Sequence, residues 1–404
     1  MRLPITMESE AELLFELAWQ SEDASHLERY LARRANIWRD FFPPGLKEEL
    51  LGKTPGQSVT LEYSPGDVLP PEAPLGTRRV AYRSFRRDKL DRSERHPKQG
   101  RFYPKGLLEN LAGVHPQNVF PMRVLEAGEK EMLADLGHPL ARFPVRLTVT
   151  VGDAARRESD TGGSCTDWRG RIADLGPGMQ AAVRGIQADF SDPDDFSRQD
   201  ESDDASFYQS PRLVGHIDSQ ADELLLREYQ AGLEPGSAVL DLMSSYESHL
   251  PLDKGLEVTG LGMNSEEMAH NPALSDHLVH NVNLRPELPF PDESFHAVLC
   301  SLSVEYMTQP VAVLGEAARV LKPEGRIGIS FSNRWFPPKT ISLWPELYEF
   351  ERLGYVLEML RRTGAFEGLE TLTLRNWWRP EEDKYYPELL TSDPVFLAWA
   401  RRKA

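Results

Sequence analysis

The sequence predicts two folded parts, a doubly wound α/β sheet in the C-terminal half and a smaller α+β domain before it. From residue 207 onward, short apolar runs alternate with helical patterns, which is typical of a mainly parallel sheet covered by helices. Residues 56–153 instead contain short β-like runs separated by turn residues. Residues 156–206 are rich in glycine, serine and aspartate, so they predict a boundary between the two parts.

Composition narrows the class of protein. The chain has 404 residues, enough for two or three domains, and a formal net charge of −17. This excess of negative charge argues against binding to nucleic acid or to an anionic membrane. The two cysteines, Cys165 and Cys300, lie far apart, so we expect neither a disulfide framework nor a metal site. No window approaches about 18 consecutive apolar residues, and acids stand where a secretory signal would be apolar, which predicts a cytoplasmic protein without a membrane segment.

The first predicted element is a helical hairpin over residues 1–50. Residues 13–18 place apolar side chains at i, i+1, i+4 and i+5, which is the spacing of one helix face. Apolar residues within 27–31 continue this stripe after a polar break. Pro43 and Pro44 end it.

The α+β domain follows over residues 56–153. Its strands are expected in "SVTLEY", "VFPMRVLEA" and "PVRLTVTVG", and the last of these alternates apolar and other residues over 145–151. A basic stretch occupies residues 78–105. Within the predicted acidic linker 156–206, the run "DFSDPDDFSRQDESDDAS" has almost no apolar content, which predicts a flexible, solvated tether, with docking onto the basic stretch as the alternative.

The C-terminal domain is predicted over residues 207–404, with strands and helices in alternation. Its expected elements, in order, are the strands "SAVLDL" and "LEVTGLGM", the helix "SEEMAHNPALSDHL", the strand "FHAVLCSLS", the helix "VAVLGEAARVL", the strand "RIGISFS", a helix near 345–363, and the strands "LETLTLRNW" and "PVFLAWARR". In open α/β sheets, ligands bind outside the carboxyl ends of the strands where strand order reverses. The turn after the first of these strands, residues 243–247, is therefore the expected site.

Two quoted segments carry a family resemblance. "LPFPDESFHAVLCSLSVEYM" and "EAARVLKPEGRIGIS" match, in order and spacing, the segments that lead into the fourth and fifth strands of one enzyme family. Residues 207–404 therefore resemble a Rossmann-like S-adenosylmethionine (SAM) dependent methyltransferase, close to the methyltransferase type 11 group. The resemblance implies SAM as the cofactor and methyl transfer as the reaction.

The departures from the family fall at the cofactor site. Where the family has VLDLGCGxG, this chain has VLDLMSSYE, and Gly262 stands where an acid normally holds the ribose hydroxyls. Serine and asparagine side chains near the strand ends are the remaining hydrogen-bonding groups. The candidate cofactor-binding residues are Asp241, Ser244, Ser245, Gly260, Gly262, Asn264, Asn281 and Ser301. The candidate catalytic residues are His249 and Glu305, which follow the first and fourth strands and can supply a base.

A second resemblance covers residues 56–153. "NVFPMRVLEAGEKEMLADLGHPLARFPVRLTVTVGDA" is similar to the closing segment of FKBP-type prolyl isomerases of the SlyD kind, and "GQSVTLEYSPGD" is similar to their opening strand. The helix that floors the isomerase pocket is missing, so the resemblance favours a polypeptide-binding module over an isomerase. Tyr63, Phe102 and Tyr103 are its candidate binding residues.

The sequence therefore leaves three functions open. The favoured one is SAM-dependent methylation of a protein or small molecule, with a polypeptide held by the FKBP-like module and tethered near the methyltransferase-like domain. The second is a non-catalytic binding scaffold built on the same sheet. The third is prolyl isomerase or chaperone activity of the N-terminal module.

Overall fold

The computed structural model describes residues 3–69, 76–89, 96–158, 164–173 and 176–404. The chain forms two compact units. The first contains Met1–Asp192 and Pro345–Tyr355, and the second contains Pro193–Trp344 and Val356–Ala404.

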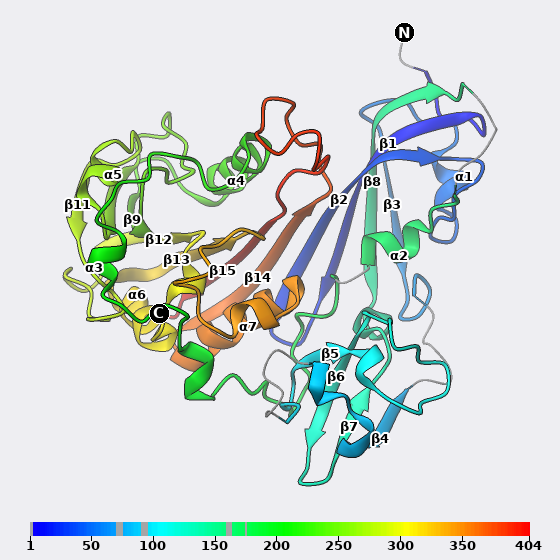
Figure 1. The fold of residues 1–404 in the computed structure, drawn as a ribbon. Coiled ribbons are helices and arrows are strands. Elements are labelled where there is room, and N and C mark those ends of the chain that lie inside the picture. Colours follow the sequence, from blue (N-terminus) through cyan, green and yellow to red (C-terminus); the bar gives the residue numbers. More distant parts are fainter. Residues whose placement is uncertain (1–2, 70–75, 90–95, 159–163, 174–175) are drawn as a thin grey trace. The chain divides into compact units, whose positions relative to one another are not determined.

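The first unit is built on an antiparallel sheet with the strand order β2–β1–β8–β3 (Figure 1). These strands are β1 (Ser9–Gln20), β2 (Ala24–Asn36), β3 (Ser58–Tyr63) and β8 (Val145–Arg156). The predicted opening and closing strands of the FKBP-like module, β3 and β8, thus share one sheet with the N-terminal residues.

The predicted helical hairpin is wrong, because residues 9–36 form a β-hairpin. Side chains of β1 alternate strictly between buried and partly buried, with Leu13, Phe15 and Leu17 in the core. Leu14 and Ala18 lie on the opposite face of the strand, and their apolar character imitated helical spacing. Period-two burial against β8 determines the structure here, as expected for a strand that packs one face on a core.

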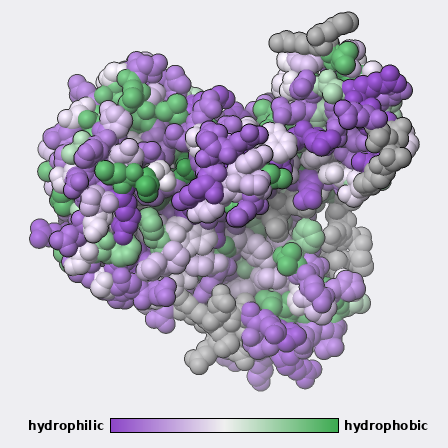
Figure 2. Space-filling model, turned by 45° about the horizontal axis from the view of Figure 1, so that its top comes forward, coloured by the Kyte–Doolittle hydropathy of each residue, from purple (hydrophilic) through white to green (hydrophobic). Residues whose placement is uncertain are grey.

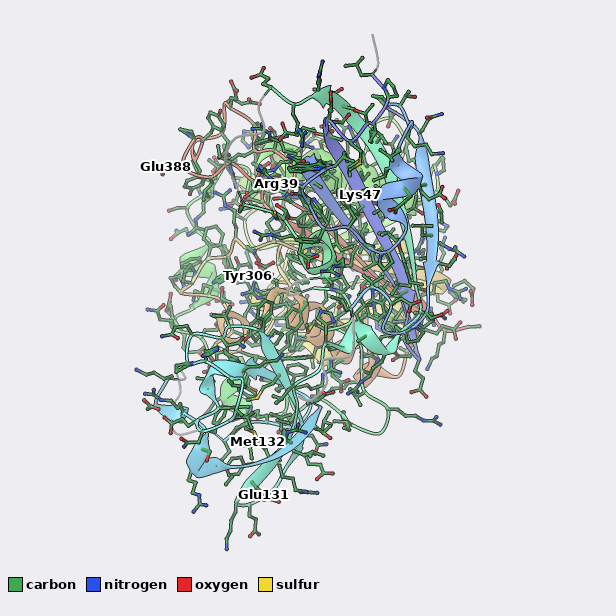
Figure 3. The ribbon with its side chains drawn as sticks, turned by 90° about the vertical axis from the view of Figure 1, so that its right-hand side faces the viewer. Arg39, Lys47, Glu131, Met132, Tyr306 and Glu388 are labelled. Carbon is green, nitrogen blue, oxygen red and sulfur yellow. The ribbon has the colours of Figure 1, made fainter. Side chains whose placement is uncertain are left out.

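A second, smaller sheet in the first unit has the order β4–β7–β6–β5. Its strands are β4 (Thr77–Ala81), β5 (Phe102–Pro104), β6 (Pro121–Ala127) and β7 (Glu131–Asp135). Glu131 is exposed while its neighbour Met132 is fully buried, which shows the alternation of β7 (Figure 3). The short helices of this unit are α1 (Leu46–Leu50) and α2 (Trp168–Ala173), with 3₁₀ turns at Tyr82–Ser84, Arg87–Lys89, Lys105–Leu107 and Pro139–Arg142.

The structure corrects the prediction of a solvated tether over residues 156–206. Among the described residues of this segment, Trp168 and Phe190 are buried, and the indole Nε1 of Trp168 donates to Asp40 Oδ2 at 2.9 Å. Asp195 and Asp204 are also buried. Ion pairs with Arg198 and Lys339 compensate the carboxylate of Asp204, whereas the prediction assumed that such carboxylates stay hydrated.

The second unit contains a seven-stranded sheet with the order β11–β10–β9–β12–β13–β15–β14. The first five strands are parallel, and β15 is antiparallel to both of its neighbours. The strands are β9 (Ala238–Ser244), β10 (Glu257–Gly262), β11 (Asp276–Val279), β12 (Phe295–Ser301), β13 (Leu321–Phe331), β14 (Phe366–Arg375) and β15 (Val395–Arg402). This confirms the predicted doubly wound α/β sheet.

The helices of this part of the chain are α3 (Asp204–Phe207), α4 (Ser219–Gly232), α5 (Ser265–Ala269), α6 (Pro310–Val320) and α7 (Glu349–Thr363), with 3₁₀ turns at Pro193–Phe196, Val304–Tyr306 and Trp344–Glu346. The helix predicted over 265–278 is shorter than expected. It ends at Ala269, and β11 follows it.

The central strands of the seven-stranded sheet are largely apolar and buried. β9 and β12 are buried along most of their length, as expected for central parallel strands covered on both faces. On the face shown in Figure 2, hydrophilic side chains predominate and hydrophobic ones form small separate groups. Within the described ranges, no helix is both long and apolar enough to cross a bilayer.

Candidate cofactor site

The second unit contains a cavity at the carboxyl ends of its central strands. The chain passes from β9 outward to β10 and β11 and then returns to β12 on the other side of β9, so strand order reverses between β9 and β12. A cavity of about 310 Å³ lies at this reversal. Ligand sites of open α/β sheets occupy this position, and their volumes begin at about 300 Å³.

The turn after β9 forms one wall of this cavity. Met243 has a φ of 62°, the left-handed backbone angle that glycine adopts at no steric cost. The residue therefore keeps the backbone conformation that the missing glycine would allow, at some cost in strain. Met243, Ser244, Ser245, Glu247 and His249 all line the cavity.

The two glycines of β10 accommodate this turn. A Cβ on Gly262 would lie 2.0 Å from the carbonyl oxygen of Ser244, and one on Gly260 would lie 3.1 Å from Ser244 Oγ. The turn thus occupies the space where a side chain at position 262 would begin. Of these two predicted site residues, Gly262 lines the cavity, and Gly260 does not.

Asp241 provides a buried carboxylate beneath the turn. Its Oδ2 accepts hydrogen bonds from Ser244 Oγ at 2.5 Å and from Ser248 Oγ at 2.6 Å. Burial raises the pKa of Asp241, and the two serine hydroxyls oppose that rise. Asn271 Nδ2 donates to Ser248 Oγ at 2.7 Å, and this bond holds the Ser248 hydroxyl in place.

The predicted asparagine and serine ligands hold the walls of the cavity. Asn264 caps α5 with its Oδ1, and its Nδ2 donates to the carbonyl oxygen of Tyr208 at 2.8 Å. Asn281 Oδ1 accepts from the backbone nitrogen of Asn283 at 3.0 Å. Ser301 Oγ is 2.8 Å from the hydroxyl of Tyr229. All three predicted ligands line the cavity, although each also has a structural role.

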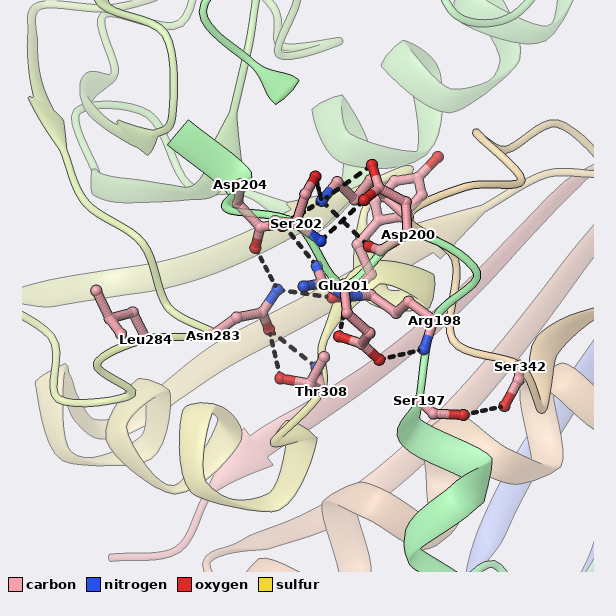
Figure 4. Close-up of polar contacts among 12 residues, drawn as sticks. Ser197, Arg198, Asp200, Glu201, Ser202, Asp204, Asn283, Leu284, Thr308 and Ser342 are labelled. Atoms are coloured by element: carbon pink, nitrogen blue, oxygen red, sulfur yellow. Dashed lines mark hydrogen bonds and ion pairs between the residues drawn. The ribbon is translucent and has the colours of Figure 1, made fainter. Parts of the chain in front are cut away.

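A segment that we predicted as linker supplies another wall. Arg198 and Asp204 line the cavity and form an ion pair at 2.7 Å. Asp204 also accepts from Asn283 Nδ2 at 3.3 Å (Figure 4) and lies 3.1 Å from the fully buried Nζ of Lys339. These contacts hold residues 198–204 against the loop that follows β11. No pattern in the sequence indicates these contacts, because the partners are far apart along the chain.

His249 and Asp222 form a hydrogen-bonded pair beside the cavity. His249 Nδ1 lies 2.5 Å from Asp222 Oδ1, and Asp222 belongs to α4. An ionised carboxylate only accepts, so Nδ1 carries the hydrogen and Nε2 keeps a lone pair in the neutral ring. Nε2 has no hydrogen-bond partner among the described residues, and His249 lines the cavity.

Two groups near this pair, Glu247 and His216, have shifted pKa values. Burial raises the pKa of Glu247, with Asp222 adding to that rise and His249 opposing it. Burial also lowers the pKa of His216, as does the nearby His249. Glu305, the second predicted catalytic residue, is fully buried and does not line the cavity, so the structure does not place it with His249.

The far wall of the cavity is aromatic. Tyr306 stacks on Phe336 with ring centroids 6.2 Å apart, and its hydroxyl accepts from the backbone nitrogen of Phe336 at 2.8 Å (Figure 3 labels Tyr306). Arg212 lies over the same Phe336 ring at 5.2 Å. This wall offers flat apolar surface next to positive charge.

The three predicted polypeptide-binding residues are not brought together. Tyr63 packs into the core of the β2–β1–β8–β3 sheet and donates its hydroxyl to the carbonyl oxygen of Pro44. Phe102 packs with Phe350, whereas Tyr103 packs against the core of the smaller sheet. No shared aromatic surface results from these positions, so polypeptide binding stays a prediction.

Comparison with known proteins identifies the class of the C-terminal domain. A family model described as "Methyltransferase domain" matches residues 244–329. A ubiquinone/menaquinone biosynthesis C-methyltransferase UbiE from Laribacter hongkongensis is 27% identical over 142 residues, which is 33% of this chain and 57% of that protein. A demethylmenaquinone methyltransferase from Tropheryma whipplei is 34% identical over 102 residues, or 24% of this chain and 39% of that protein. The matches thus span roughly half or less of these relatives' own length.

Solved structures of SAM-dependent methyltransferases also match part of this chain. A SAM-dependent methyltransferase from Aquifex aeolicus is 18% identical with a TM-score of 0.31, covering 49% of this chain and 96% of that one. One from Mesorhizobium loti is 17% identical with a TM-score of 0.29, covering 44% and 96%.

Residues 244–329 therefore match a methyltransferase domain within the doubly wound sheet, and this match supports SAM as the cofactor. Nothing in these comparisons supports the FKBP-like part of the prediction.

Proposed function

We propose that the second unit transfers a methyl group from SAM to a small protic acceptor, such as a hydroxyl or amine, with His249 as the general base. The hydrogen-bonded His249–Asp222 pair carries this proposal, because its His249 lines the same cavity as the predicted cofactor ligands. Asp222 holds the imidazole in the tautomer whose Nε2 can accept a proton.

The residues of the cavity suit this cofactor. SAM presents a sulfonium, an ammonium and two ribose hydroxyls, so it is cationic and rich in donors on one side. The lining residues include Glu247 and Glu267, which provide carboxylates for such groups. Met243 keeps the backbone angle of the missing glycine, so the turn retains its path despite the changed sequence.

The reaction needs one proton acceptor. SAM, when bound, would supply an electrophilic methyl group for the acceptor's lone pair. His249 Nε2 takes the proton from the acceptor, and Asp222 stabilises the resulting imidazolium. Arg212 and the Tyr306–Phe336 stack would orient a flat acceptor with negative charge on the other side of the cavity.

A non-catalytic binding domain is the competing function, since the turn lacks the family's glycines. The deciding assay measures transfer of a labelled methyl group from SAM to a panel of small phenols, hydroxy acids and amines. We expect His249→Gln to lower turnover by about 100-fold or more while leaving S-adenosylhomocysteine affinity within about twofold. His270→Gln, an exposed histidine of the same unit, is the matched control and should keep full turnover. Equal turnover in His249→Gln and wild type would contradict the role of His249.

A further inference from the structure

The position that holds the ribose in this family carries no side chain here. Gly262 ends β10, and a Cβ at this position would lie 2.0 Å from the Ser244 carbonyl oxygen and 3.0 Å from its carbonyl carbon. Both atoms belong to backbone, which cannot rotate away as a side-chain end can. An acid at position 262 is therefore excluded by the path of the turn after β9. If SAM binds, another residue must accept from the ribose hydroxyls.

Asn264 and Met263, the next residues after β10, do not supply a carboxylate. The amide of Asn264 is engaged at both ends: its Oδ1 accepts from the backbone nitrogens of Glu266 and Glu267, and its Nδ2 donates to Tyr208. Asn264 is thus the N-cap of α5. The cap orients the first turn of α5 so that Glu267 faces inward while Glu266 is exposed.

Glu267 is the carboxylate nearest in sequence to the vacated position. Its side chain is buried, with the residue 5% exposed, and it lines the cavity. Oε2 accepts from Ser245 Oγ at 2.7 Å, and Oε1 accepts from the backbone nitrogen of Arg212 at 2.7 Å. Each carboxylate oxygen has two lone-pair directions, so each can accept one more hydrogen bond.

Two of the other three cavity carboxylates, Asp204 and Asp241, are committed elsewhere, and the third, Glu247, belongs to the turn after β9. Asp204 is paired with Arg198 and Lys339. Asp241 accepts from two serine hydroxyls beneath the turn.

We infer that Glu267 replaces the strand-end acid of the family and accepts hydrogen bonds from the ribose hydroxyls of SAM, with its orientation set by Ser245 and Arg212. This inference rests on the proposed function, because it requires that SAM occupy the cavity. The bulkier loop after β9 and the displaced acid are then one coupled change. The loop fills the space of a side chain at position 262, and the carboxylate comes instead from Glu267 in α5.

The test measures S-adenosylhomocysteine binding to the full-length chain by calorimetry. We expect Glu267→Gln to weaken binding by about 10- to 100-fold, because it removes a charge-assisted acceptor from two hydroxyl donors. Glu266→Gln, on the exposed side of the same short helix, is the matched control and should bind as the wild type does. A thermal melt of each variant establishes that it is folded.

The 2′-deoxy and 3′-deoxy analogues of S-adenosylhomocysteine locate the interaction. Wild type should bind at least one analogue about 10-fold more weakly than the parent compound, whereas Glu267→Gln should bind parent and analogues about equally. If Glu267→Gln binds the parent as tightly as wild type does, or keeps the full penalty for the analogues, the inference is wrong while the proposed function stands.

Two further outcomes are decisive without the variant. If wild type binds both analogues as tightly as the parent, no acid holds the ribose and the inference is overturned even where Glu267→Gln fails to fold. If wild type binds no S-adenosylhomocysteine at millimolar concentration, the proposed function fails and the inference with it.

Discussion

Replacing Gly262 with alanine tests how the rebuilt turn and β10 depend on each other. An alanine Cβ would lie 2.0 Å from the Ser244 carbonyl oxygen, whereas real Cβ atoms keep at least 3.0 Å. The turn or the strand must then move by about 1 Å, in a region where both are packed. Overpacking of this kind costs about 3 kcal/mol, which lowers the melting temperature of a unit of this size by about 6–12 °C.

The assay is thermal unfolding of the full-length protein, followed by calorimetric titration with S-adenosylhomocysteine. Gly315→Ala is the control, since a Cβ there meets nothing within 4 Å and the residue lies inside α6. This control should unfold at the wild-type temperature or slightly above it, because alanine favours the helix by up to about 1 kcal/mol. If Gly262→Ala unfolds within about 1 °C of wild type and binds the ligand equally well, the close approach of the turn to β10 is wrong.

Three further changes have defined outcomes. Asp222→Asn should lower methyl-transfer turnover by about 100-fold without changing S-adenosylhomocysteine affinity, because the neutral amide no longer stabilises the imidazolium and can offer its own N–H to the ring; an unchanged rate would contradict the role of the pair. Lys339→Met should lower the free energy of unfolding in urea by about 3 kcal/mol, since it leaves the buried Asp204 without that cation; the exposed Lys384→Met should stay within about 0.5 kcal/mol. Asp241 has a raised pKa in the folded state, so the protein binds more protons folded than unfolded and loses stability as pH rises above the ordinary range of an aspartate. As pH rises from 4 to 8, the melting temperature of wild type should therefore fall relative to that of Asp241→Asn. If the two curves of melting temperature against pH run parallel, burial does not destabilise this carboxylate.

The C-terminal sheet was predictable because its signals are local. β9, β12 and β13 are apolar runs that are buried on both faces, and helical patterns separate them. The quoted motifs around β12 and β13 indicated a methyltransferase domain, and the domain match covers residues 244–329.

The N-terminal hairpin was mispredicted because both of its faces carry apolar residues. Leu13 and Leu17 face the core while Leu14 and Ala18 lie on the other face, so the same letters satisfy a helical spacing. Pairing with β8, more than a hundred residues later, decides between the two periods. Single-sequence periodicity cannot contain that information.

The candidate site was predicted in part. Position in the fold identified the turn after β9, and the unusual Gly260 and Gly262 marked β10, although only the structure shows that they make room for Ser244. Glu267 was missed because a glutamate in the first turn of a helix is normally a surface residue that favours the helix dipole. Its burial follows from contacts with Ser245 and Arg212, which are distant in sequence.

The measurement that tests the central claim most directly is calorimetric titration of SAM and S-adenosylhomocysteine into the full-length protein, with a thermal melt in parallel. The account predicts binding of at least one of them at micromolar concentration and a rise in melting temperature with ligand concentration. Absence of both heat and thermal shift up to millimolar ligand would contradict a SAM site in this cavity and would favour a binding domain that has kept the sheet of a methyltransferase.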